Sequence, residues 1–413
     1  MCLLPVAIGL DASRKLGTLR GMANKLLALM LTTLATFTPS IHAQSESNGK
    51  LPPTAKLPLL RELPDPFKMD NGKRIKSASE WPARRAEILK MALQYEYGRV
   101  PTTVDPVTAT ESPAEKSGDR VEHKIVVKMG PEGKVSTHVI LTTPVGAGPF
   151  PVIVKGDMTW GRVNPEIIST VIGRGYALAE FDRTEIAADK NDRGVGVFPL
   201  FPDYDWGVLA AWAWGYGRVN DYLITRADID KTKLIITGHS RGGKATLLAG
   251  ALDERVALTV PNGSGCGGAG LFRVEWPTSE NIHAVTKSFP FWFGPHFDEF
   301  VGHVDQLPFD QHEMKALIAP RALLTTDSLD DLWANPLGTQ ISFQASREVF
   351  SFLGAADKTG IHYRHGKHDQ NAEDFGALLD FADWQLMGKK PTTKFDDVPF
   401  PTTPSAYSWT APH

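Results

Sequence analysis

A serine between two glycines is the residue of this sequence whose chemistry is easiest to name. Ser240 stands in the pattern Gly-x-Ser-x-Gly, after the β-branched run 235–237 and before a small-residue helical pattern. A strand, a sharp turn and a helix in this order are typical of a nucleophile elbow, which exposes the serine hydroxyl. Glycines suit such a turn because side chains beside the strained serine would clash. We therefore predict Ser240 as a nucleophile, although a tight turn that merely contains a serine would carry the same letters.

A serine hydroxyl attacks a substrate only when a base, usually a histidine, takes its proton. The chain has 12 histidines, and two of them, His365 and His368, directly follow the strand that we predict at 361–363. This is where an α/β-hydrolase carries its base. We favour His368, with His365 as the runner-up and a surface position as the plain alternative for either. His239 adjoins the serine, but we expect it to point away in an elbow.

The histidine in turn needs a carboxylate to orient it. Asp327, Asp330 and Asp331 all follow the strand predicted at 322–325. One of them can orient the base, while the others cap the next helix or stay solvated. The residues alone do not choose among the three. The chain order serine, aspartate, histidine is that of the α/β-hydrolases.

Two cations accompany the serine. The backbone N–H of Arg241, the residue after the nucleophile, is an expected oxyanion donor, and its guanidinium can add charge to the same hole. Lys244 lies one helical turn further on and is expected to face the same opening. Together they indicate an anionic or carboxyl-derived, polyhydroxylated substrate. The plain alternative is that Arg241 pairs with a buried carboxylate.

Tryptophans near these motifs are candidates for stacking on a sugar ring. Trp276, Trp292 and Trp333 lie in the segments between the serine and the histidines. Indole rings provide flat apolar faces for such contacts, but most tryptophans simply fill the core. We expect a substrate contact from Trp292 and Trp333.

The elements that must position these residues alternate between strands and helices. Residues 121–128 and 135–141 alternate apolar and polar side chains around a Gly-Pro turn, which predicts an antiparallel hairpin at a sheet edge. Buried-type strands are predicted at 151–154, 176–181, 234–237, 258–260, 322–325 and 361–363, and helices at 81–97, 165–174, 206–226 and 372–387. This alternation predicts a doubly wound, mostly parallel α/β-hydrolase sheet. Ligands of such sheets bind at the carboxyl ends of the strands, where Ser240, Asp331 and His368 can meet.

The amino terminus has the features of an export signal. A signal peptide is predicted over 1–43, with Met22 as the alternative start. It has a basic residue, Lys25, then an apolar stretch beginning at residue 26, and the small residue Ala43 at the cleavage site. The stretch is short for a membrane span, and an uncleaved anchor is the alternative. We expect an extended arm at 44–75, one catalytic domain at 76–395 and a tail at 396–413.

Charge and cysteine content indicate the cellular compartment and the classes of partner. The net charge is −3 and no basic run is present, so nothing indicates nucleic-acid binding. Removal of the signal would leave Cys266 as the single cysteine, which excludes an internal disulfide and favours a bacterial periplasmic or secreted protein. We expect Cys266 to be a buried, inert thiol rather than a nucleophile. No zinc spacing occurs, and no metal or other cofactor is expected.

With these residues in place, the chain resembles the glucuronoyl esterases, carbohydrate esterase family 15, over most of its mature length. The pattern Gly-x-Ser-Arg-x-Gly-Lys is far more specific than the general elbow. The other matching blocks are Trp206-Gly207, 212–215, 218, 221–223, 265–269, 280–282, 289–293, 331–336 and His368.

The resemblance implies a role for each matching residue. Ser240 would be the nucleophile, His368 the base and Arg241 an oxyanion ligand. Lys244, Glu280 and Trp333 would contact the hydroxyls and ring of a glucuronate. Many members carry the acid as a glutamate just before Ser-Gly-x-Gly-Gly, but this chain reads Asn262-Gly263 there. Bacterial members with an aspartate two residues before the loop tryptophan make Asp331 the expected acid, with Asp330 in reserve.

The sequence thus predicts an exported serine esterase that forms an acyl-enzyme with esters of (4-O-methyl-)glucuronic acid, as in lignin–glucuronoxylan linkages. A general carboxylesterase or acetyl-xylan-type esterase is the alternative enzyme, and a carbohydrate-binding relic of the fold the alternative without activity. We expect a monomer with no nucleic-acid partner and no stable membrane partner.

Overall fold

A computed structural model describes residues 51–102, 105–401 and 405–412 of the chain. The signal peptide expected at 1–43 lies outside the described residues. The strands are β1 Thr108–Glu111, β2 Glu115–Ser117, β3 Arg120–Met129, β4 Val135–Pro144, β5 Phe150–Lys155, β6 Ala177–Phe181, β7 Ile229–His239, β8 Val256–Asn262, β9 Ala322–Ser328 and β10 Thr359–Arg364. The helices are α2 Trp81–Ala92, α3 Pro165–Gly173, α4 Val208–Leu223, α5 Arg241–Leu252, α6 Ile282–Ser288, α7 Gln311–Ala316, α8 Pro336–Phe352 and α9 Ala372–Met387.

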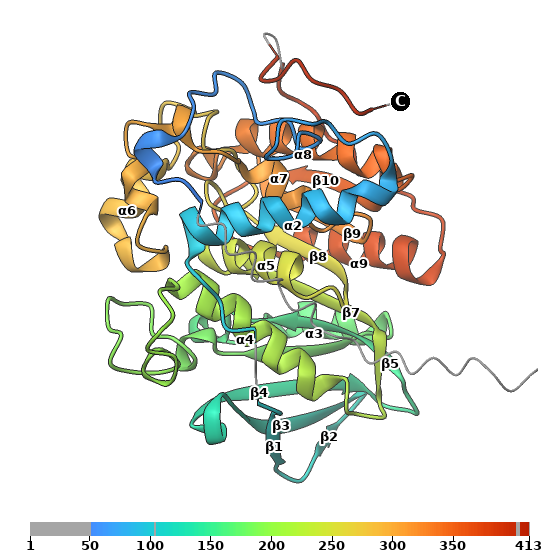
Figure 1. The fold of residues 1–413 in the computed structure, drawn as a ribbon. Helices are drawn as coiled ribbons and strands as arrows, with labels where there is room; N and C mark the ends of the chain where they lie inside the picture. Colours follow the sequence, from blue (N-terminus) through green and yellow to red (C-terminus); the bar gives the residue numbers. More distant parts are fainter. Residues whose placement is uncertain (1–50, 103–104, 402–404, 413) are drawn as a thin grey trace, which may run out of the picture. The chain divides into compact units, whose positions relative to one another are not determined.

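One twisted sheet joins all of these strands. Its order is β1-β3-β4-β6-β5-β7-β8-β9-β10, with β2 paired to β3. The strands from β6 and β5 through β10 run parallel, whereas β1 to β4 are antiparallel to their neighbours. The structure confirms the predicted α/β-hydrolase architecture with an antiparallel hairpin near one edge (Figure 1).

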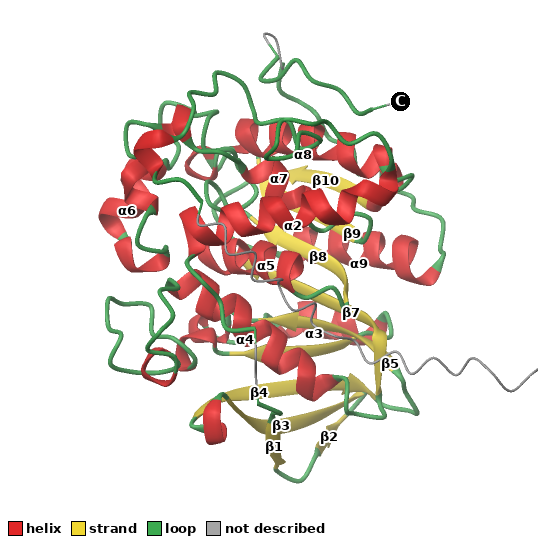
Figure 2. Cartoon of the chain, in the orientation of Figure 1, coloured by secondary structure: helices red, strands yellow, loops and turns green. Residues whose placement is uncertain are grey.

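Helices cover both faces of the parallel part of the sheet (Figure 2). Alternate residues of one strand enter different cores: Ile153 and Ile235 pack with α3 and α9, while Val154 and Ile236 pack with α4 and α5. This follows from the two-residue period of a strand, and it explains why these strands read as unbroken apolar runs. In Figure 1, α2, α4 and α5 lie in front of the strands.

Two helix predictions differ from the structure in length. The helix expected at 81–97 is α-helical only to Ala92 and continues as a π-helical turn, Leu93–Tyr97. The helix expected at 206–226 is α4, which is shorter at both ends. Patterns of apolar residues locate helices well and their ends less well, because the ends depend on local hydrogen bonds.

The segment at 51–75 is irregular, as expected of an arm, but it is packed onto the domain. Leu63 and Phe67 are buried, and Phe67 contacts Trp409 of the tail edge-to-face, with 6.1 Å between ring centroids. The Trp409 indole N–H donates to the Leu63 carbonyl (2.8 Å). The described parts of the arm and the tail therefore form one layer over the domain.

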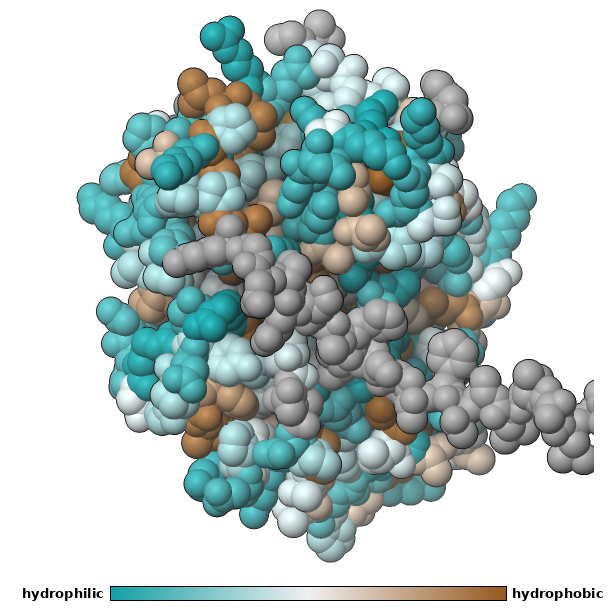
Figure 3. All heavy atoms as spheres, viewed as in Figure 1, coloured by the Kyte–Doolittle hydropathy of each residue, from teal (hydrophilic) through white to brown (hydrophobic). Residues whose placement is uncertain are grey.

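Most side chains on the face seen in Figure 3 are hydrophilic, with apolar ones in small separate groups. No helix among the described residues is both long and apolar enough to cross a membrane.

Candidate active site

Ser240 occupies the turn between β7 and α5. Its φ of 55° and ψ of −122° are unusual for a residue with a side chain, which is the strain expected of an elbow. The flanking glycines are needed for space: a Cβ at Gly242 would lie 2.0 Å from Asp157 Oδ1, and one at Gly238 would lie 2.6 Å from the Gly242 carbonyl oxygen. The sharp turn thus presents the Ser240 hydroxyl at the carboxyl edge of the sheet.

The structure brings Ser240, His368 and Asp331 together. His368, which follows β10, has its Nε2 2.8 Å from Ser240 Oγ. Its Nδ1 is hydrogen-bonded to Asp331 Oδ2, from the loop after β9. The bond to Asp331 raises the pKa of His368, and partial burial opposes this. A carboxylate on Nδ1 leaves Nε2 facing the serine, which is the arrangement a general base requires.

The three neighbouring aspartates have different environments. Asp327 is buried and accepts a hydrogen bond from Thr339 Oγ1 (3.1 Å), and burial raises its pKa to about 7. Asp330 is exposed and contacts His365 Nδ1 (3.2 Å). Only Asp331 contacts His368 among these three, so the structure separates the triad candidates that the sequence left open.

His239 is closer to the base than expected. It makes no bond to Ser240, but its ring packs on that of His368, with centroids 4.4 Å apart. Its Nδ1 is 2.7 Å from Asn262 Oδ1, where the sequence lacks the family glutamate. Burial and the charge of His368 lower the pKa of His239 to about 4. A neutral ring therefore packs against the base at neutral pH.

Arg241 carries hydrogen-bond donors that nothing in the described structure occupies. Its backbone N–H begins α5, where helix geometry leaves the first N–H groups without intrahelical acceptors. Its Nε is buried and has no hydrogen-bond partner. Its Nη1 donates to Asp189 Oδ2 (2.5 Å), which fixes the guanidinium. Arg241 thus pairs with a carboxylate through Nη1, which was the alternative, and keeps Nε and the backbone N–H available for the expected oxyanion role.

Trp292 is a correction to the sequence prediction of an open stacking face. It is only 2% exposed, and Phe289 stacks on it at 3.9 Å between centroids. The Arg241 guanidinium lies 4.8 Å from its ring, and its indole N–H donates to Asp189 (2.8 Å). Trp292 is therefore a buried support for Arg241 and Asp189, because its ring and its indole N–H are already used in contacts within the protein.

Lys244 and Glu280 form a buried ion pair. Lys244 is 2% exposed, and its Nζ donates to Glu280 and to the carbonyls of Ser264 (2.7 Å) and Cys266 (2.5 Å). All three ammonium donors are used, so Lys244 does not face an opening as we expected. Burial raises the pKa of Glu280, and Lys244 opposes this. The direct contact of Lys244 with a substrate stays a prediction, and its observed role is to hold Glu280.

Trp333, by contrast, is 52% exposed, although it follows the acid Asp331 by two residues. Its carbonyl accepts the backbone N–H of Glu280 (3.0 Å), so an open indole and a buried carboxylate adjoin the triad. Trp276 is half-buried in the same region. Cys266 is buried, which raises its pKa well above that of a free thiol, so it is a poor nucleophile.

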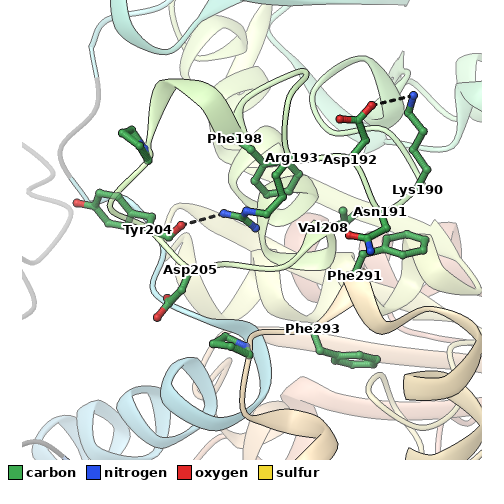
Figure 4. Close-up of a pocket in the computed structure, with 12 residues that line it drawn as sticks. Lys190, Asn191, Asp192, Arg193, Phe198, Tyr204, Asp205, Val208, Phe291 and Phe293 are labelled. Atoms are coloured by element: carbon green, nitrogen blue, oxygen red, sulfur yellow. Dashed lines mark hydrogen bonds and ion pairs between the residues drawn. The ribbon is translucent and has the colours of Figure 1, made fainter.

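A pocket of about 320 Å³ is lined partly by sequence neighbours of Asp189 and Trp292 (Figure 4). It is lined by residues that follow Asp189, such as Lys190 and Arg193, and by Phe291 and Phe293 on either side of Trp292. Among the described residues, no group of three or more histidine, cysteine or acidic side chains is placed to hold a metal ion.

Sequence reasoning missed three residues that shape this site: Asp157, Asp189 and Trp160. Asp157 accepts the backbone N–H of His239 (2.8 Å) and pairs with Lys155 and Arg183. Its place directly after β5 is a signal that the carboxyl-edge argument could have used. Asp189 lies in an irregular loop without a pattern to mark it.

Comparisons with known proteins identify the sequence family that the chain matches. The family model described as glucuronyl esterase of fungi matches residues 126–354. The 4-O-methyl-glucuronoyl methylesterase of Podospora anserina is 36% identical over 315 residues, which are 73% of this chain and 63% of the relative.

Two solved structures extend the likeness to the fold. A carbohydrate esterase family 15 glucuronoyl esterase from Caldicellulosiruptor kristjansonii superposes with a TM-score of 0.75 at 34% identity, covering 87% of this chain and 99% of that one. A serine-to-alanine variant of the Sporotrichum thermophile glucuronoyl esterase, solved with methyl 4-O-methyl-β-D-glucopyranuronate, has a TM-score of 0.67 at 28% identity, covering 83% and 93%.

Proposed function

Because the chain belongs to the glucuronoyl esterases, carbohydrate esterase family 15, we propose that it is a serine esterase that hydrolyses esters of (4-O-methyl-)glucuronic acid. The observation that carries this is the hydrogen-bonded series Ser240–His368–Asp331 beside the unpaired donors of Arg241. The ligand bound to the Sporotrichum enzyme supports the uronate ester as the substrate class. The natural linkage would join glucuronoxylan to lignin alcohols.

The geometry supports an acyl-enzyme mechanism. His368 Nε2 takes the proton of Ser240 Oγ while the oxygen attacks the ester carbonyl. The backbone N–H and Nε of Arg241 receive the negative charge that develops on the carbonyl oxygen. The tetrahedral species collapses, His368 protonates the departing alcohol, and the glucuronoyl group remains on Ser240. Water, activated by the same histidine, then releases the acid.

On the acyl side, Glu280 and Trp333 are the groups placed to contact the sugar. The Glu280 carboxylate can accept hydrogen bonds from glucuronate hydroxyls, and the exposed Trp333 indole can pack on the pyranose ring. Lys244 supports this by fixing Glu280. Buried polar groups built for hydroxyls discriminate strongly against acyl groups that lack them.

The first experiment is the Ser240→Ala variant, assayed on the methyl ester of 4-O-methyl-glucuronic acid. The value of kcat is expected to fall by about 10⁶-fold, while circular dichroism and Tm stay those of the parent. A folded variant that retains turnover would contradict the proposal. An active-site label for serine hydrolases should modify the parent protein and spare the variant, which also separates an enzyme from a binding relic.

A second experiment separates the uronate esterase from a general carboxylesterase or acetyl-xylan esterase. The parent is compared on methyl glucuronate, methyl galacturonate and acetylated xylan. We expect the highest kcat/KM on the glucuronate. Faster release of acetate than of methanol would favour the general esterase instead.

We also propose that the protein is exported, to a bacterial periplasm or beyond, and acts as a monomer. The export is supported by the signal-like segment at 1–43 and by the single cysteine that would remain after its removal. Mass spectrometry of the protein expressed with its own amino terminus should find a chain beginning near Gln44, and gel filtration should give the mass of one chain. A cytoplasmic, full-length product would contradict the export.

A further inference from the structure

One large aromatic side chain stands open beside the catalytic serine on the side away from Trp333. Trp160 lies five residues after the end of β5 and is 52% exposed. The sheet order places β5 on one side of β7 and places β8 and β9 on the other. Since Ser240 follows β7 and Trp333 follows β9, the two open tryptophans flank the nucleophile from opposite sides along the carboxyl edge.

The Trp160 ring is held in place from within the protein. The guanidinium carbon of Arg183 lies 4.5 Å from its ring centroid and 4.6 Å from that of the buried Trp212. Arg183 is fully buried and donates from Nη1 to Asp157 and to the Gly156 carbonyl (2.9 Å). A fixed cation stacked against an indole holds the ring in place, so a ligand meets a surface that needs no ordering.

The ring also adjoins the group that must serve the leaving alcohol. Trp160 meets the His239 ring edge-to-face at 6.2 Å between centroids, and His239 packs on His368 at 4.4 Å. The alcohol oxygen has to lie within hydrogen-bond reach of His368 Nε2 to be protonated. From there the carbon skeleton beyond that oxygen can extend past the His239 ring to Trp160.

We propose that Trp160 is a specificity residue that forms an aromatic platform for the alcohol part of the ester and favours alcohols with an aromatic ring. This inference rests on the proposed function, because it assigns the acyl part to Glu280 and Trp333 on the opposite side. Aromatic rings prefer offset or edge-to-face contacts, which a half-exposed indole with one supported face offers. The carboxylate that suits sugar hydroxyls, Glu280, lies on the acyl side instead.

The test compares two esters of the same acid, benzyl and methyl glucuronate, in the parent, Trp160→Ala and Trp160→Phe. Benzyl and methyl alcohol have similar acidity, so the ratio of the two kcat/KM values reports the contact with the ring. This ratio is expected to fall by about tenfold in Trp160→Ala, the size of one good aromatic contact. Trp160→Phe should retain most of the ratio. Because the alcohol leaves during acylation, the effect belongs to kcat/KM and not to deacylation.

Two further tryptophans provide controls. Trp384 lies near the end of α9, which starts just past the carboxyl end of β10 and runs back to the opposite edge of the sheet, and Trp384→Ala should leave the ratio unchanged. Trp333→Ala should lower kcat/KM for both esters together, as expected for the acyl side.

Several outcomes would overturn the inference. An equal loss on both esters in Trp160→Ala means that the ring only supports Arg183 and the elbow. An unchanged ratio means that no contact exists. If Trp160→Ala lowers kcat/KM more for an ester whose acid is part of a glucuronoxylo-oligosaccharide than for benzyl glucuronate, Trp160 binds the sugar chain and not the alcohol. If the parent hydrolyses neither ester, the proposed function itself fails, which is a separate result. Should Trp160→Ala not fold, Trp160→Leu removes the aromatic ring and keeps the apolar bulk.

Discussion

At the scale of single residues, the histidine that each carboxylate contacts decides which aspartate is the acid of the triad. Asp330 and Asp331 are adjacent and both approach a histidine, yet Asp331 is buried against His368 and Asp330 is exposed against His365. A carboxylate that fixes the tautomer of the base must lie on Nδ1 with its own position held, which only Asp331 does. Asp330 instead accepts the Gly366 N–H (2.8 Å) and shapes the loop.

Asparagine substitutions should separate these two roles. Asp331→Asn is expected to lower kcat by about 10⁴-fold. The amide favours the wrong tautomer of His368, and it does not stabilise the imidazolium that forms during the reaction. Asp330→Asn, the matched control, should cost less than about tenfold. The measurement is kcat on methyl glucuronate for both variants, and equal losses would contradict the assignment.

The pH dependence gives an independent check of the same bond. His368 must be neutral to accept the serine proton, and Asp331 raises its pKa above 6.5. The parent should therefore lose kcat/KM as the pH falls through a value above 6.5. In Asp331→Asn the charged partner is gone, so the acidic limb of the residual activity should move to lower pH. A limb that stays in place would mean that another group controls it.

At the scale of elements, the elbow depends on an ion cluster beneath the start of α5. Asp157 is buried, and although burial alone would raise its pKa, Lys155 and Arg183 lower it. It accepts the His239 N–H and packs against Gly242, so the end of β7 and the first turn of α5 are fixed to β5. The oxyanion donors of Arg241 are positioned by this contact.

Gly242→Ala should therefore damage the site. The added Cβ would lie 2.0 Å from Asp157 Oδ1, and Arg183 prevents that carboxylate from moving freely. Overpacking of this kind costs about 1–3 kcal/mol, and we expect a lower Tm and at least about a tenfold loss in kcat/KM. Gly217→Ala on α4 is the control, since no heavy atom lies within 4 Å of its added Cβ. That change should stabilise slightly and keep full activity, and similar behaviour of the two variants would contradict the argument.

The elements themselves were largely predictable, and the reasons are physical. Strands buried on both faces read as apolar runs, and the carboxyl-edge rule then brings residues after β7, β9 and β10 together. The sequence does not show which way a side chain points within a loop. Three aspartates within five residues are equivalent by sequence, and so are Trp292 and Trp333, although the structure buries Trp292 and exposes Trp333. The π-helical turn Leu93–Tyr97 also follows from tertiary contacts and not from spacing.

At the scale of the whole molecule, buried polar groups join the amino-terminal segment to the site. Glu96, in the π-helical turn, is fully buried and accepts from Gln311 Nε2 of α7 (3.1 Å). Its Oε1 would lie 3.4 Å from a Cβ on Gly267, in the glycine loop that carries the carbonyl partners of Lys244. The packing of the first helix is thus continuous with the acyl side of the site.

Glu96 should make the stability of the folded chain depend on pH. Burial raises its pKa from 4.5 to about 8. Between these values the unfolded chain loses the proton while the folded chain keeps it, so the free energy of unfolding falls as the pH rises. Glu96→Gln removes the titration while keeping the shape. The free energy of unfolding of the variant should therefore gain on that of the parent from about pH 4.5 to about pH 8 and then level off, with a total gain on the order of a few kcal/mol. The measurement is Tm as a function of pH, which should rise in the variant relative to the parent over the same range. Glu166→Gln, on the exposed start of α3, is the matched control, and a difference in Tm between Glu96→Gln and the parent that does not vary with pH would refute the buried ionisation.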